Sequence, residues 1–181
     1  MIYTKSLNYK YETDVFVAGG GPSGVAAAVA AARNGKKVFL AEATGCFGGL
    51  GTSGLVPAFA PFDDGENILA GGIGYEIRQR LSRSTPLRNW TTLDIEELKR
   101  EYDKIIVESG VDFSFFTTVY DVIVDNGKVQ SVILGSKSGL FAVKAKIYID
   151  CTGDGDLCAF GGADYEIGDE NGVVMPQTLC S

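Results

Sequence analysis

The chain contains no histidine, and this absence narrows the chemistry that we expect of it. Histidine is the commonest metal ligand and the side chain best suited to general base catalysis at neutral pH. The four cysteines are too widely spaced for a CxxC or CxxxxC pair, and they are Cys46, Cys151, Cys158 and Cys180. We therefore expect neither a metal site nor a redox-active dithiol. All four cysteines are interpreted as packing residues, although Cys46 lies beside a glycine-rich loop and is the one candidate for reactivity.

Positive charge is also scarce, because 16 Lys and Arg face 23 Asp and Glu, for a net charge of -7. No cluster of Lys or Arg appears, so nucleic acid is not an expected partner. No apolar run approaches the roughly 18 residues of a membrane span. Residues 1–13 lack the apolar stretch of a signal peptide. We expect a cytoplasmic protein with no membrane partner.

Glycine, by contrast, is abundant, at 24 of 181 residues. An acidic protein can bind an anionic cofactor through oriented backbone N–H groups, which glycine-rich turns supply. Residues 14–18 read as a buried strand, residues 25–33 as a helix of small residues, and residues 37–42 as a second strand. Gly35 follows that helix, where a helix-ending glycine is expected. The order predicts a β-α-β unit of a parallel sheet.

Later segments predict more helices and strands. Residues 71–83 have a helical pattern, and Asp94 is expected to cap a second helix that Gly110 ends. The positions expected to face inward are Ile73, Ile77 and Leu81 on the first helix, and Leu98, Tyr102, Ile105 and Ile106 on the second. Strands are predicted at residues 113–118, 119–124, 128–134, 140–145 and 146–151, with a hairpin turn at Asn126-Gly127. The predicted fold is α/β and Rossmann-like, a parallel sheet flanked by helices with an inserted antiparallel β-meander.

The first candidate site lies between the first strand and the first helix, in the pattern Gly19-x-Gly21-x-x-Gly24. Gly21 would let the backbone approach a pyrophosphate, and Gly24 would let the helix pack close to the strand. Pro22 loses nothing in the first helical turn, where an N–H has no helical partner. We expect this segment, including Ser23, to bind phosphate at the helix N-terminus; the alternative is an ordinary turn.

Glu42 ends the second strand, about 20 residues after Gly21, where a carboxylate should accept hydrogen bonds from an adenosine ribose. An acid at this position favours a ribose without a 2′-phosphate. The alternative is an exposed glutamate at the end of a strand.

Two further glycine-rich segments are candidates for the same ligand. Gly48, Gly49, Gly51 and Thr52 form a dense glycine loop that could bring N–H groups to a pyrophosphate and ribityl chain. The segment Thr152-Gly153-Asp154 follows a strand in the second half of the chain. The alternatives are a flexible surface loop for the first and a simple turn for the second.

The segments VFVAGGGPSGVAAAVAAARNGKKVFLAE, GCFGGLGTSGL and IDCTGDGDL together resemble FAD-dependent oxidoreductases of the two-dinucleotide-binding-domain superfamily, with the fumarate-reductase-like branch most similar. The resemblance covers nearly the whole chain from Asp14. It implies FAD as cofactor, with pyrophosphate at the first motif, ribose at Glu42, and the glycine loop near the pyrophosphate and ribityl chain. It also implies that the backbone of Val119 lies near adenine and that Thr152-Gly153-Asp154 is a second glycine contact. Cys151 replaces the usual alanine of that segment.

Members of that family are longer and carry a substrate domain over the flavin. We therefore expect residues 1–181 to be an FAD-binding domain and an N-terminal fragment, with the substrate domain missing after about residue 173. The expected function is an oxidoreductase that passes a hydride or electron pair between a small organic substrate and flavin; no substrate or catalytic residue is assigned. An NAD-dependent dehydrogenase and a non-enzymatic binding protein on the same fold, like the GDP-dissociation inhibitors, remain alternatives.

Overall fold

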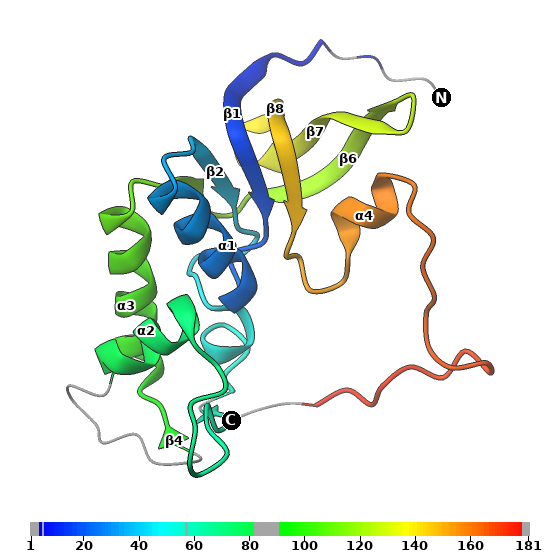
Figure 1. Ribbon diagram of the computed structural model, residues 1–181. Coiled ribbons are helices and arrows are strands. Elements are labelled where there is room, and N and C mark those ends of the chain that lie inside the picture. The colour runs from blue at the N-terminus through cyan, green and yellow to red at the C-terminus, as the bar shows by residue number, and fades with distance from the viewer. Residues whose placement is uncertain (1–3, 5, 57, 82–90, 179–181) are drawn as a thin grey trace.

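A computed structural model describes residues 4, 6–56, 58–81 and 91–178, with the side chains of Thr91 and Thr92 left out (Figure 1). Its helices and strands are, in chain order, β1 (Tyr9–Ala18), α1 (Pro22–Arg33), β2 (Val38–Ala41), the 3-10 turn η1 (Gly49–Gly51), β3 (Ala58–Phe59), α2 (Gly72–Leu81), β4 (Thr91–Thr92), α3 (Ile95–Glu108), β5 (Asp112–Ser114), β6 (Thr118–Asp125), β7 (Lys128–Ser136), β8 (Gly139–Asp150) and α4 (Asp156–Phe160).

The main sheet has six strands in the order β5-β2-β1-β8-β7-β6. Strands β5, β2, β1 and β8 run parallel to one another, whereas β6, β7 and β8 form an antiparallel meander. The α/β fold with a parallel sheet and an inserted meander is thus confirmed. Only residues 115–117 connect β5, at one edge of the sheet, to β6, at the other edge. The sheet must therefore curl so that its two edges approach each other.

Each face of the parallel strands packs into its own core, because successive side chains of a strand point to opposite faces. Val15 and Val17 of β1 pack beneath α1, α2 and α3. Phe16 and Ala18 of the same strand pack under the meander and α4. Figure 1 shows the three larger helices on one side of β1 and the meander with α4 on the other.

Local signals in the sequence account for the ends of the helices. The Asp94 side chain accepts a hydrogen bond from Glu97 N at 3.0 Å and caps α3, as predicted. Gly35 and Gly110 follow α1 and α3 with φ of 72° and 71°, a conformation that favours glycine. The predicted inward face of α3 is also confirmed, since these four side chains are buried: Leu98, Tyr102, Ile105 and Ile106.

Ile77 and Leu81 of α2 are buried as predicted, and the half-buried Ile73 packs against the same core. The predicted end of this helix, residues 82–83, lies outside the described residues. The hairpin at Asn126-Gly127 is confirmed, since both residues have positive φ and Asp125 pairs with Lys128.

Three strand predictions were wrong in their extent. β1 begins at Tyr9 rather than at residue 14, because its polar first half pairs with β8. The strands predicted at residues 140–145 and 146–151 are one strand, β8, which pairs with β7 along its first part and with β1 along most of its length. The strand predicted at residues 113–118 is divided, because Phe116 has φ of 49° and turns the chain between β5 and β6.

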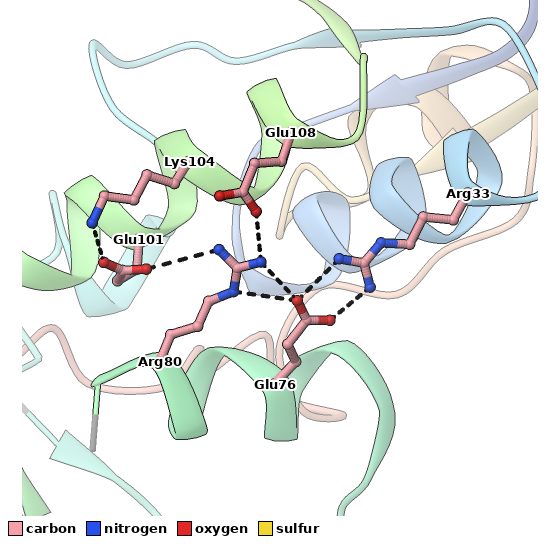
Figure 2. Close-up of polar contacts among 6 residues, drawn as sticks. All are labelled: Arg33, Glu76, Arg80, Glu101, Lys104 and Glu108. Atoms are coloured by element: carbon pink, nitrogen blue, oxygen red, sulfur yellow. Dashed lines mark hydrogen bonds and ion pairs between the residues drawn. The ribbon is translucent and has the colours of Figure 1, made fainter. Parts of the chain in front are cut away.

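A network of ion pairs joins the three larger helices (Figure 2). Arg33, at the end of α1, pairs with both carboxylate oxygens of Glu76 on α2, at 2.6 and 3.0 Å. Arg80 contacts Glu76 at 2.8 Å and Glu108 of α3 at 2.7 Å. Arg80 also lies 3.9 Å from Glu101, which Lys104 contacts. The network holds the C-terminal end of α1 against α2 and α3.

Replacing Glu76 with Gln is expected to lower the free energy of unfolding by about 1 kcal/mol at neutral pH. The hydrogen bond from Arg33, opposed by partial burial and assisted by Arg80, lowers the pKa of Glu76 from 4.5 to about 2. A lowered pKa contributes stability that is complete above pH 4.5 and is lost as the pH falls toward 2. Urea unfolding of both proteins across this range checks the prediction. A difference that does not shrink with falling pH would contradict it.

Candidate functional site

The carboxyl ends of the parallel strands border a cavity of about 710 Å³. β1, β2 and β8 end side by side at this edge, and the curl of the sheet brings the start of β6 to it. Its lining residues are Gly19, Gly21, Pro22, Ser23, Ala41, Glu42, Ala43, Thr44, Gly49, Leu50, Ser53, Gly54, Thr117, Thr118, Val119, Cys151, Thr152, Gly153, Asp154 and Asp156. Ligands of open α/β sheets bind at this edge of the strands.

The N-terminus of α1 faces this cavity. Gly21 is the capping residue and, being a glycine, offers no side chain to accept a hydrogen bond from the first turn of the helix. The N–H groups of Ser23 and Gly24 have no acceptor among the described residues, although Gly24 is buried. Unpartnered first-turn N–H groups and the helix dipole attract anions. Because none of the described lining residues is Lys or Arg, these groups are the positive end of the cavity.

The fold requires glycine at two of the three glycine positions of the first motif, but not at the third. A Cβ at Gly24 would lie 1.8 Å from Gly19 O, and one at Gly19 would lie 2.2 Å from Cys151 O. These two glycines are therefore needed for packing of α1, β1 and β8. Gly21 has an ordinary φ of -65°, and a Cβ there would meet nothing within 4 Å. The folded chain itself does not require glycine at position 21.

Glu42 lies at the end of β2 and is 6% exposed. Its Oε2 accepts a hydrogen bond from Gly20 N at 2.6 Å, and its Oε1 accepts one from Thr44 N at 2.6 Å. The alternative of an exposed strand-end acid is therefore wrong. The carboxylate lines the cavity and also fixes the backbone on both sides of it, and each oxygen retains a further lone pair for a ligand.

The glycine loop after β2 divides into lining and supporting residues. Gly49 lines the cavity, whereas Gly48, Gly51 and Thr52 do not. Thr52 is fully buried, and its hydroxyl donates to Phe47 O at 2.6 Å. Gly48 has φ of 107°, and a Cβ there would lie 2.5 Å from the Thr52 side chain. These residues shape the loop, and both the hydroxyl and the N–H of Thr52 are used in hydrogen bonds within it.

The segment after β8 is held by a carboxylate that the sequence analysis did not assign to the site. Asp150 Oδ1 accepts hydrogen bonds from Thr152 N at 3.0 Å and from Thr152 Oγ1 at 2.8 Å. Its Oδ2 accepts one from Cys158 N at 2.9 Å. Partial burial raises the pKa of Asp150, but the hydrogen bonds from Thr152 and Cys158 outweigh it and leave that pKa below its usual value.

Most of the predicted site residues share this one cavity. The predicted residues among its lining are Gly19, Gly21, Pro22, Ser23, Glu42, Gly49, Val119, Thr152, Gly153 and Asp154. Gly24, like the supporting residues of the glycine loop, does not line it. Thr117 and Thr118 line the cavity beside Val119, and no motif indicates them, because the chain reaches the cavity there only through its turn at Phe116.

The cysteines were only partly predicted. Cys151 is half-buried, packs against the core beneath α1 and also lines the cavity. Burial raises the pKa of its thiol. Cys158 is exposed, so its interpretation as a packing residue was wrong; its backbone N–H donates to Asp150 and so ties α4 to β8. Cys46 is half-buried, and Cys180 lies outside the described residues.

Other features of the described structure do not compete with this cavity. Across residues 4, 6–56, 58–81 and 91–178, no group of three or more His, Cys, Asp and Glu could hold a metal ion. In the same residues, no helix combines the length and apolar character needed to cross a bilayer. A second cleft, of about 610 Å³, is lined by side chains that already form ion pairs with one another, among them Glu76, Arg80 and Glu108.

Known proteins resemble the chain in sequence and in fold. The thiamine thiazole synthase of Pyrococcus horikoshii is 27% identical over an alignment of 164 residues that covers 84% of this chain and 62% of that protein. The geranylgeranyl bacteriochlorophyll reductase-like protein of Thermoplasma acidophilum is 19% identical with a TM-score of 0.64, over 85% of this chain and 43% of that chain. The FAD complex of glycerol-3-phosphate dehydrogenase from Bacillus halodurans is 18% identical with a TM-score of 0.59, over 86% of this chain and 38% of that chain.

The two structures support the fold alone at these identities, and the chain spans less than two thirds of each of these relatives. The family assignment comes from the sequence, which matches the FAD dependent oxidoreductase family over residues 14–180. This match extends from β1 through every segment that lines the cavity, and it confirms the predicted family and the predicted cofactor class. The chain belongs to the FAD dependent oxidoreductase family.

Proposed function

We propose that the cavity at the strand ends binds FAD and that the protein is an oxidoreductase. The observation that carries this proposal is that position 21 is a glycine although the fold does not require one there. Gly21 lies beside the unpartnered N–H groups of Ser23 and Gly24. Gly21 also lines the cavity, so a side chain at position 21 would enter the space that a ligand needs. A diphosphate placed there would explain both the missing side chain and the unpartnered donors.

Residues around the cavity fit the remaining parts of FAD. The N–H groups of Ser23 and Gly24 would hold the pyrophosphate. Glu42 Oε1 and Oε2 would accept hydrogen bonds from the ribose hydroxyls, in addition to those that they accept from the backbone. The backbone of Val119, which is held in the sheet opposite Leu134, would border the adenine. Gly49 and the Thr152-Gly153-Asp154 segment would complete the walls.

Bound flavin would supply the redox step, the transfer of a hydride or an electron pair to or from an organic substrate. The residues that line the cavity would position the cofactor. Neither a substrate nor a catalytic acid or base is assigned.

The visible absorption spectrum of the purified full-length protein tests this proposal. We expect a yellow protein that releases FAD on denaturation. A nicotinamide-dependent dehydrogenase or a non-enzymatic binding protein on the same fold would be colourless. A colourless protein that also fails to take up added FAD would contradict the proposal.

A further inference from the structure

We propose that Asp150 is a positioning residue, which acts through the Thr152 hydroxyl to hold the Thr152-Gly153-Asp154 segment in the shape that the cofactor requires. This inference rests on the proposed function. Asp150 itself does not line the cavity, whereas Thr152, Gly153 and Asp154 do. Its influence on a ligand must therefore pass through the residues that it holds.

The Asp150 carboxylate spans the whole connection between β8 and α4. One oxygen accepts hydrogen bonds from the N–H and the hydroxyl of Thr152, at the start of the connection. The other accepts the N–H of Cys158 in the first part of α4. A single side chain thus fixes both ends of the loop that carries Gly153 and Asp154.

The Thr152 hydroxyl relays this constraint to the middle of the loop. Its oxygen accepts hydrogen bonds from Gly155 N and Asp156 N, both at 3.0 Å. A hydroxyl has one proton, and with both N–H groups pointing at the oxygen that proton is directed to Asp150 at 2.8 Å. Without a carboxylate at position 150, the hydroxyl loses the acceptor that sets its orientation.

This arrangement leaves a short exposed segment in which some backbone N–H groups are available to a ligand. Gly153 has φ of 93°, and a Cβ there would meet nothing within 4 Å. The N–H groups of Gly153 and Asp154 have no acceptor in the part of the chain that the structure describes. The N–H groups on either side are used internally, by Asp150 and by Thr152. The clamp therefore leaves two adjacent donors on the cavity wall for a ligand.

Isosteric substitutions in the full-length protein separate positioning from general stability. Asp150→Asn keeps the side-chain size but leaves one acceptor oxygen instead of two, so the side chain can no longer accept from both Thr152 and Cys158 N. Thr152→Val removes the hydroxyl while keeping the shape of the side chain. We expect each variant to bind FAD about tenfold more weakly, the loss that one hydrogen bond of about 1.4 kcal/mol would give. Because Asp150 acts through Thr152, the FAD affinity of the double variant should be no more than about threefold lower than that of the single variant that binds FAD less tightly.

Asp94→Asn is the matched control, because Asp94 also caps a helix by accepting a backbone N–H but does not line the cavity. It should lower the melting temperature of the apo-protein and leave the FAD dissociation constant unchanged. The proposal is overturned if Asp150→Asn binds FAD within twofold of wild type, or if the double variant shows the product of the two single losses. Should Asp150→Asn not fold, retention of wild-type affinity by Thr152→Val overturns it. A wild-type protein that binds no FAD overturns the proposed function, and this inference with it.

Discussion

Gly21→Val is expected to abolish FAD retention while the protein remains folded. A Cβ at this position would meet nothing within 4 Å in the folded chain, and its φ of -65° suits any residue. In the proposed complex the same space holds the pyrophosphate, so the valine would push it away from the α1 N-terminus. We expect FAD affinity to fall by about a hundredfold or more, or about 2.7 kcal/mol. Flavin content per protein after purification measures the effect.

Gly24→Val is the control that distinguishes loss of the cofactor from loss of the fold. A Cβ at Gly24 would lie 1.8 Å from Gly19 O, so this variant should lose its fold and not only its cofactor. Circular dichroism should therefore be near wild type for Gly21→Val and strongly changed for Gly24→Val. Wild-type flavin content in a folded Gly21→Val protein would show that the phosphates bind elsewhere.

The sequence predicted those parts of the fold whose signals are local. The strand, turn and helix of β1 and α1 follow from apolar periodicity and glycine spacing within one segment. Asp94 as a cap and Asn126-Gly127 as a hairpin turn depend on the conformational preferences of the residues themselves. The predictions that failed depend on partners distant in the chain. The polar first half of β1 is a strand only because β8 provides hydrogen bonds for it.

The candidate site shows the same division. The glycines and Glu42 could be found because a motif fixes both their residue types and their spacing. Thr117 could not, because it reaches the cavity through the hydrogen bond from its N–H to Glu42 O, between segments far apart in sequence. Asp150 has a signal in the sequence, an acid at the end of a strand two residues before a threonine. Its importance becomes visible only when Cys158 N is seen to bind the other oxygen.

Glu42→Ala is expected to weaken FAD binding about tenfold to a hundredfold, because a charge-assisted hydrogen bond to a ribose hydroxyl contributes roughly 1.5–3 kcal/mol. The structure adds a second effect. The buried N–H of Gly20 and the partly buried N–H of Thr44 would lose their acceptor, and the loss at Gly20 alone would cost about 1–3 kcal/mol in stability. The variant should therefore unfold at a lower urea concentration even without cofactor.

Flavin mononucleotide separates these two effects, because it lacks the adenosine ribose. Titration of the apo-protein with both nucleotides should show FAD affinity falling at least tenfold further than the affinity for flavin mononucleotide. Glu12→Ala is the matched control, since Glu12 is an exposed glutamate of β1 outside the cavity, and it should change neither affinity. If both affinities fall together in Glu42→Ala, the carboxylate acts only by holding Gly20 and Thr44. If FAD affinity stays within twofold of wild type, the ribose is bound by other groups.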